Sequence, residues 1–321
     1  MLRKIGSVLV AIISALFVWN TSLFTAPITV DGPHLIAHRG VHQQYDRTDL
    51  GMSDCTAARW IDTGHSFQEN TLTSIEAAFA LGAKVVEIDI HQTIDDRFVV
   101  FHDRTIDCRT EGNGEVTDHD LTYLQSLDIA YGYTAPDGSH PFRGDGVGLM
   151  PSLTEVLRAF PDGLFLINIK SGASRHGEAF VSLIRNNPEW VSQIWGVYGG
   201  HKPSKLAAEQ LGNLRWYSRQ TTKACLKDYA ILGWTGHVPE ACQTGIVAVP
   251  HNYARFLWGW PRKFEQRMTN SGSTVILLGD HQSGNSGSRG IDTPDQFARV
   301  PNGFGGLVWT NRIEVIAKDA D

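Results

Sequence analysis

The chain has 321 residues, of which 42% are hydrophobic and 19% charged, and its formal net charge is −6. This length suits one globular domain of ordinary size. With a pI of about 6.1 the chain lacks the basic character of nucleic-acid-binding domains, so we expect no nucleic-acid partner.

The N-terminus predicts export. Arg3-Lys4 precedes an apolar stretch from Ile5 to Trp19, which matches the charged and hydrophobic regions of a signal peptide. Residues 5–24 also approach the roughly 20 residues that span a bilayer, so residues 1–26 predict either a cleaved signal peptide or a retained membrane anchor. The basic residues come first, so in both cases the body of the chain, residues 33–321, is expected in the periplasm or outside the cell.

The sequence contains evidence against cleavage of the N-terminal segment and also against its retention as a membrane anchor. A cut after Ala26 would place Phe24 at the minus-three position and Pro27 just after the cut, and signal peptidase disfavours both. The polar residues 20–22 interrupt a membrane span. A buried first helix and a transit peptide are weaker alternatives, the latter because it would contain more Arg and Ser.

The first body strand is predicted to end at a histidine. The apolar run Leu35 to Ala37 stops at His38, and Arg39-Gly40 follows. Further on, Asn70-Thr71 can cap a helix whose apolar residues recur at helical spacing through residues 72–81. Gly82 is a typical stop for such a helix.

The second strand carries two carboxylates on one face. In the run from Val85 to Ile90, Glu87, Asp89 and His91 occupy alternate positions, so their side chains point the same way. Carboxylates two apart lie roughly 7 Å from each other, close enough to grip one cation between them. His91 is predicted equally well to be a hydrogen-bonded packing residue.

Two later runs also end in polar side chains. Phe98 to Phe101 is followed by His102-Asp103, and the run from Leu164 to Ile169 places Asn168 and Lys170 on one face. All these polar groups follow apolar segments in the chain direction, which is where parallel α/β barrels keep their active sites.

The rest of the chain continues the alternation of strands and helices. A helix is predicted over residues 153–160, and residues 131–148 are expected to form an ordered excursion. Further strands are predicted at Ile194–Tyr198, Leu214–Ser218, Gly245–Val249, Thr274–Leu278 and Gly306–Thr310. This gives nine strands where a closed barrel has eight, so we expect one early segment to be a hairpin or part of an insert.

Two further features concern export and the surface. Four cysteines allow three disulfide connectivities, of which we expect Cys55–Cys108 and Cys225–Cys242 in an oxidising compartment. Four buried free thiols are the alternative. The aromatic segment 256–261, followed by Arg262-Lys263, is expected to be a barrel helix with inward-facing aromatics, or else to touch a membrane surface.

The four motifs together resemble one known family. The order His-Arg-Gly, Glu-Asn-Thr, Glu-x-Asp and His-Asp at residues 38–40, 69–71, 87–89 and 102–103 resembles the glycerophosphodiester phosphodiesterase family. The family's fold is an α/β TIM (β/α)8 barrel, and residues 305–312 look like its last strand. Here the barrel would follow an N-terminal signal or anchor helix and carry an insert after its first strand.

The resemblance implies roles for the site residues. His38 and His102 would be the acid–base pair, and Arg39 and Lys170 would bind the substrate phosphate. A divalent metal, Ca²⁺ or Mg²⁺, would take its ligands from carboxylate and amide oxygens, here Glu87, Asp89 and Asn168. Glu69, as a partner of Arg39 or a metal neighbour, and His91 are secondary candidates; Glu69 otherwise only caps the following helix.

These residue types fit the cleavage of an anionic phosphodiester. A cation would offset the phosphate charge and polarise a phosphoryl oxygen, and Arg39 can bind two phosphate oxygens at once. Histidine titrates near neutral pH and can exchange protons with the attacking and leaving hydroxyls. In the family the glycerol 2-hydroxyl is thought to attack first, which implies a cyclic phosphate that water then opens.

Three features depart from the family pattern. Asn168 stands where the family has glutamate, which removes one negative charge and predicts weaker metal binding. Residues 41–68 are longer than the usual connection and are expected to form a lid or side wall that sets substrate choice. Residues 278–281 replace a tryptophan-containing strand end.

Several functions are compatible with these departures. We expect hydrolysis of glycerophosphodiesters to glycerol 3-phosphate and an alcohol. The alternatives are a lysophospholipase D-type activity on a larger lipid-like substrate and a non-catalytic phosphodiester binder. A glycosidase fits poorly because Glu87 and Asp89 lie on one strand, whereas glycosidases place their carboxylates on either side of a sugar.

Overall fold

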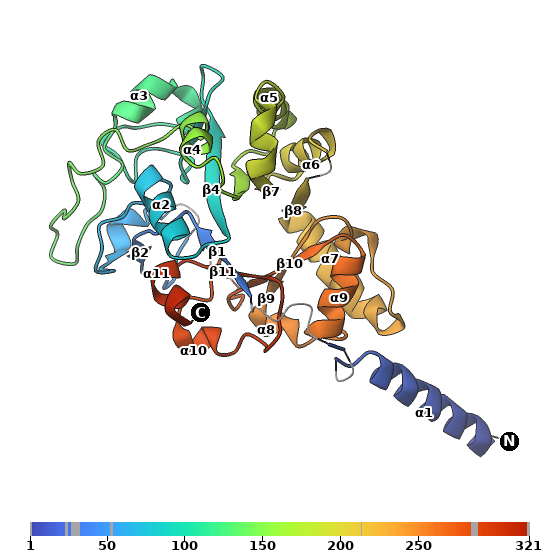
Figure 1. Ribbon diagram of the computed structural model, residues 1–321. Coiled ribbons are helices and arrows are strands. Elements are labelled where there is room, and N and C mark those ends of the chain that lie inside the picture. Colours follow the sequence, from blue (N-terminus) through green and yellow to red (C-terminus); the bar gives the residue numbers. More distant parts are fainter. Residues whose placement is uncertain are drawn as a thin grey trace.

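A computed structural model describes residues 2–22, 25–26, 33–51, 54–212, 214–283 and 288–319. The strands that build the central barrel (Figure 1) are β1 (His34–His38), β4 (Val85–Gln92), β6 (Phe165–Ile169), β7 (Ile194–Gly199), β8 (Arg215–Ser218), β9 (Ile246–Pro250), β10 (Thr274–Leu278) and β11 (Leu307–Thr310).

These strands form a nearly closed parallel sheet. Their order is β8-β7-β6-β4-β1-β11-β10-β9, and each neighbouring pair on this path is parallel. The end strands β8 and β9 lie next to each other, which almost completes the circle. The expected α/β TIM barrel is therefore confirmed.

The ninth predicted strand forms a hairpin with the strand before it, which is one of the two outcomes expected from the sequence. β5 (Phe98–Val100) pairs antiparallel with β4, with Ile90 opposite Val100. It ends before Phe101, so His102 lies in the loop that follows the hairpin. This hairpin brings the second histidine back beside the carboxylate strand.

The helices alternate with the strands around the barrel (Figure 1). They are α2 (Leu72–Ala80), α3 (Leu121–Ser126), α4 (Leu153–Ala159), α5 (Ser174–Arg185), α6 (His201–Gln210), α7 (Arg219–Leu232), α8 (His251–Ala254), α9 (Arg262–Asn270), α10 (Pro294–Phe297) and α11 (Ile313–Ile316). The Thr71 side chain caps α2 by accepting from Ser74 N, and Ser152 forms a capping box with Glu155 at α4.

The strands are buried on both faces, which explains their continuous apolar runs. Inside the barrel, Ile36, Val85, Leu166, Ile276 and Trp309 form one cluster. The alternate positions on the same strands pack outward against the helices in a larger cluster. The barrel interior is thus filled with side chains, and the polar side chains gather at its rim.

The expected insert after β1, residues 41–68, is present and packs against the excursion formed by residues 131–148. It contains the hairpin of β2 (Gln44–Tyr45) and β3 (Trp60–Ile61). Ala57 of the insert packs with Tyr133 and Phe142 of the 131–148 excursion. The two excursions therefore form a small wall beside the barrel mouth with a core of its own.

Both expected disulfides are present. Cys55 and Cys108 are bonded with a Cα–Cα distance of 5.2 Å, which ties the insert to the loop after β5. Cys225 of α7 and Cys242 are bonded with a Cα–Cα distance of 4.8 Å. Neither distance requires movement of the backbone.

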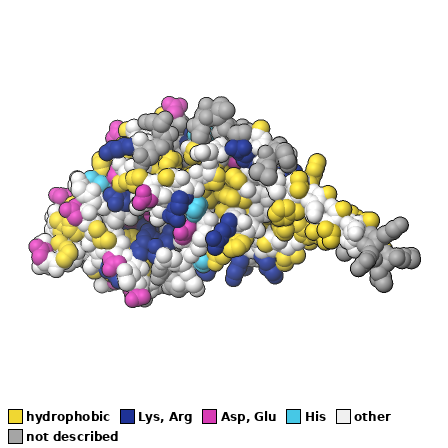
Figure 2. Space-filling model, turned by 90° about the horizontal axis from the view of Figure 1, so that it is seen from below, with side chains coloured by type: hydrophobic (Ala, Val, Ile, Leu, Met, Phe, Trp, Pro, Cys, Tyr) yellow, Lys and Arg dark blue, Asp and Glu magenta, His cyan; other side chains and the backbone are white. Residues whose placement is uncertain are grey.

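The N-terminal helix α1 (Leu2–Trp19) projects away from the barrel (Figure 1). Figure 2 shows hydrophobic side chains gathered at this end of the molecule, with Lys and Arg side chains beside them. Within the described ranges, no helix combines the length and apolar character needed to cross a bilayer. Phe24 and Pro27, which bear on the expected cleavage site, lie outside the described residues.

The aromatic segment 256–261 differs from the expected helix. It is a series of turns, and helix α9 begins only at Arg262. Leu257 is buried and Trp258 and Trp260 pack against the core, but Phe256 is 61% exposed. Gly259, at φ 80°, and Pro261 explain why the run does not form one continuous helix, and one aromatic side chain is left on the surface.

The Cys225–Cys242 bridge should contribute to stability. The double variant Cys225→Ser/Cys242→Ser should lose about 3 kcal/mol of unfolding free energy, because the bridge restricts the unfolded chain. Urea denaturation measures this loss. Thiol titration of the denatured, unreduced wild type should find no reactive thiol, and four reactive thiols would contradict both bridges.

Candidate active site

The register of neighbouring strands brings the predicted residues to one end of the barrel. His38 of β1 lies opposite Glu87 of β4. Asp89 of β4 lies opposite Asn168 of β6, which in turn lies opposite Tyr198 of β7. These positions are at the carboxyl ends of parallel strands, the end where barrel enzymes build their active sites.

Two backbone turns beside this row are held in a left-handed conformation. Arg39 and Asn70 both have φ of 60°, which is uncommon for residues other than glycine. Arg39 N donates to Glu87 O at 2.9 Å, and Asn70 N donates to Arg39 O at 3.0 Å. Gly40, at φ 77°, has no room for a Cβ against the Ser74 backbone. Strain of this kind gathers at functional sites.

Asp89 is the buried centre of the row. Its Oδ2 accepts from Asn70 Nδ2 at 3.2 Å and pairs with Arg39 Nε at 3.2 Å. Its Oδ1 accepts from Asn168 Nδ2 at 2.7 Å and lies 3.6 Å from Lys170 Nζ. Burial alone would raise the pKa of Asp89, but Lys170 and the other neighbouring cations hold it well below its usual range.

Glu87 has a different environment on the same strand face. Its Oε1 accepts a hydrogen bond from Tyr198 OH at 2.5 Å. Its Oε2 is buried and accepts no hydrogen bond, and it lies 3.7 Å from His38 Nε2. Burial, together with the negative charge of Asp89, raises the pKa of Glu87 well above its usual value. Glu87 is therefore the acidic group of the site whose negative charge its neighbours compensate least.

His38 is oriented by a neutral amide. Its Nδ1 lies 2.6 Å from Asn311 Oδ1, and the amide nitrogen of Asn311 donates to Asp292 Oδ2 at 2.8 Å. Because an amide oxygen only accepts, the proton of neutral His38 is on Nδ1. Its Nε2 carries the lone pair and accepts from Arg39 Nε at 3.1 Å. Burial, followed by Arg39, lowers the pKa of His38 well below its usual value.

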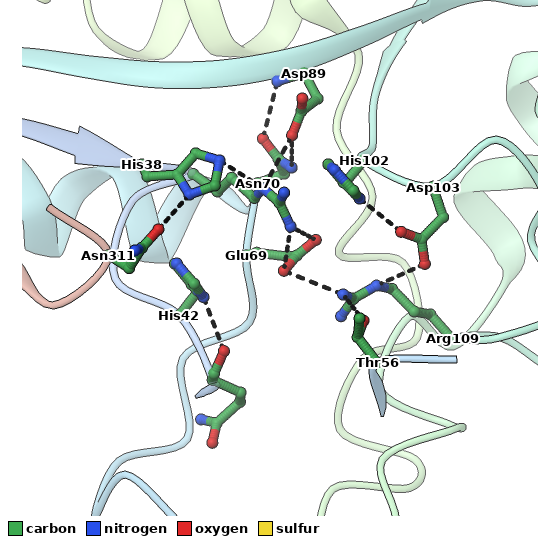
Figure 3. A network of polar contacts seen from close by, with 12 residues as sticks. His38, His42, Thr56, Glu69, Asn70, Asp89, His102, Asp103, Arg109 and Asn311 are labelled. Atoms are coloured by element: carbon green, nitrogen blue, oxygen red, sulfur yellow. Dashed lines mark hydrogen bonds and ion pairs between the residues drawn. The ribbon is translucent and has the colours of Figure 1, made fainter. Parts of the chain in front are cut away.

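His102 is oriented by a carboxylate instead. Its Nδ1 lies 2.6 Å from Asp103 Oδ1 (Figure 3). Asp103 Oδ2 accepts from Arg109 Nε at 3.0 Å. Burial would raise the pKa of Asp103, but Arg109 and then His102 hold it well below its usual range, so Asp103 is ionised. Burial and then Arg39 lower the pKa of His102.

Glu69 lies between two arginines of the site and pairs with both. Both of its oxygens lie 3.2 Å from Arg39 Nη1, and Oε2 also pairs with Arg109 Nη2 at 3.3 Å. Arg109 and then Arg39 lower the pKa of Glu69 against the effect of its burial. Of the readings open from sequence, the structure shows Glu69 as a partner of Arg39, while Thr71 caps the helix.

Two further histidines are buried near the site. His91 Nε2 lies 3.4 Å from the carbonyl oxygen of His102, so His91 packs under the loop that carries the second histidine. His42 contacts His38 edge to face with ring centroids 5.8 Å apart, and its Nδ1 donates to Gln43 O at 2.8 Å. Burial lowers the pKa of each of these histidines to about 4, so both are neutral at physiological pH.

The structure therefore brings every predicted site residue into one network. Sequence reasoning missed several of their partners: Asn70, Arg109, Tyr198, Asp292 and Asn311. Three of these carried a signal. Asn70 was part of a motif but was interpreted as a cap, Tyr198 ended a predicted strand, and Asn311 followed the last one. Arg109 and Asp292 lie in loops where sequence spacing gave no signal.

Comparison with known proteins places this geometry in one family. The sequence model of the Glycerophosphoryl diester phosphodiesterase family matches residues 38–198. The chain is similar to a glycerophosphodiester phosphodiesterase of Caldanaerobacter subterraneus, with 37% identity over 106 residues, 32% of this chain and 40% of that protein. It is also similar to a human lysophospholipase D, with 30% identity over 132 residues and 40% of each chain covered. It thus spans about two fifths of these relatives.

Solved structures share the fold at low sequence identity. A glycerophosphoryl diester phosphodiesterase domain from Mycobacterium tuberculosis matches with a TM-score of 0.63 and 16% identity, over 90% of this chain and 100% of that chain. An Oleispira antarctica phosphodiesterase in complex with the product sn-glycerol-3-phosphate matches with a TM-score of 0.54 and 17% identity, over 90% of this chain and 97% of that chain.

The Asn70 side chain should stabilise the fold through Asp89. The Asn70 side chain donates from Nδ2 to Asp89 Oδ2 and accepts at Oδ1 from Asp89 N, each at 3.2 Å. Asn70→Gly keeps the left-handed backbone accessible but removes these two hydrogen bonds, so it should lower the unfolding free energy by about 1.5–3 kcal/mol, the value for hydrogen bonds to a charged group. Asn70→Ala should lose about 1 kcal/mol more, because alanine resists positive φ. Urea denaturation of both variants provides the measurement. A glycine variant as stable as the wild type would show that these bonds contribute nothing.

Proposed function

Because this chain belongs to the Glycerophosphoryl diester phosphodiesterase family, we propose that it is a phosphoric diester hydrolase that splits glycerophosphodiesters into glycerol 3-phosphate and an alcohol. One observation carries the proposal. His38 and His102, each with a different hydrogen-bond partner, lie in one buried network at the barrel mouth together with Arg39 and the Glu87–Asp89 pair. The product found in a structural neighbour, sn-glycerol-3-phosphate, agrees with this substrate class.

The two histidines suit opposite roles. His38 is paired with a neutral amide and keeps the lone pair on Nε2, so it acts as the base that takes a proton from the attacking hydroxyl. His102 is paired with the ionised Asp103, which stabilises the imidazolium form, so it acts as the acid. A new phosphorus–oxygen bond forms while the bond to the leaving alcohol breaks, and His102 gives that alcohol its proton.

Two cations are placed to receive the substrate phosphate. Arg39 and Lys170 both pair with Asp89 from their own loops, so their positive charges converge beside the imidazoles. The guanidinium can bind two phosphate oxygens and the ammonium one. The substrate's negative charge would in turn offset the cations that lower the pKa of His102.

The acidic residues fit a divalent cation such as Ca²⁺ or Mg²⁺. The orphaned Glu87 Oε2 and the adjacent Asp89 carboxylate would hold it, with Asn168 as the third ligand. The described residues contain no cluster of three or more His, Cys, Asp or Glu arranged for a metal, so the proposed ligand set depends on the amide at position 168. When bound, the cation would offset phosphate charge and polarise a phosphoryl oxygen.

Glycerol 3-phosphate release from glycerophosphocholine tests the proposed activity. His38→Ala should lower kcat by about 10²–10⁴-fold, the usual contribution of acid–base catalysis, and a chelator should abolish the wild-type rate. The exposed His237→Ala variant serves as control and should keep full activity. Hydrolysis indifferent to both His38→Ala and the chelator would refute the mechanism, and ³¹P NMR would show whether a cyclic phosphate precedes the product.

The same assay separates the alternatives. A rate on lysophosphatidylcholine above that on glycerophosphocholine would assign a lysophospholipase D-type activity, as in the human relative's name. Binding of glycerophosphocholine without turnover would assign a phosphodiester binder. We prefer hydrolysis because a binder has no use for two imidazoles with their own oriented partners.

An asparagine at position 168 should weaken metal binding. Asn168→Glu restores a charged oxygen beside Asp89 and should tighten the binding of Ca²⁺ or Mg²⁺ on the order of tenfold, about 1.4 kcal/mol. Isothermal titration measures the affinity directly, without reference to catalysis. Asn168→Gln is the matched control that adds length without charge. Equal affinities for the glutamate and glutamine variants would show that charge at this position does not limit metal binding.

We also propose that the chain is exported to the periplasm or the cell exterior, either after cleavage of a signal peptide or while tethered by residues 5–24. The two disulfides support an oxidising compartment. The exposed apolar side chains of α1 support an N-terminal segment that leaves the barrel for another environment. Accumulation of the oxidised chain in the cytoplasm of its host would overturn this proposal.

A further inference from the structure

Arg109 lies at the centre of the polar network although no part of the proposed reaction uses it (Figure 3). Its side chain is only 3% exposed, and a buried guanidinium requires partners for its charge and its donors. It comes from the loop after β5, which also carries His102. Its five donors can serve several acceptors in a fixed plane.

The guanidinium connects two carboxylates. Nε donates to Asp103 Oδ2 at 3.0 Å, and Nη2 pairs with Glu69 Oε2 at 3.3 Å. Each carboxylate uses its remaining capacity on a residue of the proposed mechanism. Asp103 holds the ring of His102, and Glu69 holds the guanidinium of Arg39. One buried side chain therefore contacts the hydrogen-bond partners of both the proposed acid and the proposed phosphate ligand.

Arg109 is in turn held by the wall beside the barrel mouth. Nη2 donates to Thr56 Oγ1 at 2.8 Å, and Nη1 donates to Tyr133 OH. Thr56 and Arg109 directly follow Cys55 and Cys108 in the chain, and these two cysteines are bonded. The disulfide thus lies next to the hydrogen bond that joins the insert to Arg109.

We propose that Arg109 is a positioning residue for His102 and Arg39, and that the Cys55–Cys108 disulfide keeps it in place, so that reduction of this one bridge lowers the hydrolytic rate. This inference rests on the proposed function. It gives the insert a role that the sequence did not predict: the insert holds the Arg109 side chain in place. A displacement of about 1 Å at a catalytic group can cost about 10²-fold in rate.

The competing explanation is that Arg109 only neutralises two buried carboxylates. Lysine separates the two explanations, because it keeps the charge but cannot reproduce a planar fork that binds Asp103, Glu69 and Thr56 together. If neutralisation is enough, Arg109→Lys should retain nearly full activity. If positioning matters, Arg109→Lys should lose nearly as much as Arg109→Met.

The kinetic experiment compares Arg109→Lys, Arg109→Met and Cys55→Ser/Cys108→Ser with the wild type on glycerophosphocholine. We expect kcat/KM to fall about 100-fold for both Arg109 variants and about tenfold for the cysteine variant. The cysteine change should cost nothing further in the Arg109→Met background, because both act through one side chain. Cys225→Ser/Cys242→Ser is the matched control, since it removes the other bridge, and it should keep wild-type kinetics.

A second readout does not depend on turnover. In protein labelled with ¹⁵N-histidine, the Nδ1 proton of His102 in its hydrogen bond to Asp103 should give a downfield signal, assigned by its absence in Asp103→Ala. The signal should weaken or disappear in Arg109→Met and in the Cys55–Cys108 variant, and persist in the Cys225–Cys242 variant. If the His102 signals of the variants follow this pattern but the wild type does not hydrolyse glycerophosphocholine, the proposed function is refuted and the positioning role of Arg109 stands.

Two results would overturn the inference. One is Arg109→Lys or Cys55→Ser/Cys108→Ser with kcat/KM within twofold of the wild type. The other is an unchanged His102 signal in Arg109→Met. Circular dichroism and urea denaturation confirm that each variant is folded under the assay conditions, so that a loss of rate is not a loss of fold.

Discussion

The buried carboxylate of Asp89 is the interaction on which the site depends. It is fully buried, so its charge is tolerated only because donors surround it. Those donors come from three other segments: Arg39 after β1, Asn70 before α2, and Asn168 with Lys170 at the end of β6. Each segment is therefore fixed relative to β4 by the same charge. The loops of a barrel are otherwise its most variable parts.

The two histidines of the site differ in the chemistry of their hydrogen-bond partners. An amide and a carboxylate hold the two Nδ1 atoms at the same distance, 2.6 Å. The geometry is thus equivalent while the electrostatics differ, because only the carboxylate stabilises an imidazolium. In the proposed reaction it is this difference between the partners that assigns the base role to His38 and the acid role to His102. The sequence left this assignment open because Asn311 lies 273 residues from His38.

Local patterns predicted most of the fold, and long-range contacts account for what they missed. Alternation on β4 placed Glu87 and Asp89 on one face, and parallel register then put them opposite His38 and Asn168. Period-two patterning and strand-end position are properties of nearby residues, so a sequence displays them. The disulfide pairs were also inferred, since pairing by proximity in sequence happened to match proximity in space.

Two of the missed partners, Arg109 and Asp292, belong to loops, whose geometry no sequence periodicity describes. Arg109 reaches Thr56 across 53 residues, and Asp292 accepts from Asn311 across 19 residues, next to the backbone hydrogen bond from Ile291 N to Trp309 O. Asn70 was misinterpreted for a different reason, since asparagine caps helices and also adopts positive φ. In the structure Asn70 adopts positive φ, and Thr71 caps the helix.

The charge of the whole site links these observations to its chemistry. The carboxylates of Glu69, Glu87, Asp89 and Asp103 face the cations of Arg39, Arg109 and Lys170. Glu69 and Asp103 are committed to the arginines, which leaves Glu87 as the carboxylate whose charge is least compensated. A phosphodiester would add a further negative charge beside it. An added cation at Glu87 would balance both, and a glutamate at position 168 would have made the imbalance larger. If the proposed cation binds here, the asparagine would reduce the negative charge that the cation must offset, and the cation would be held with lower affinity.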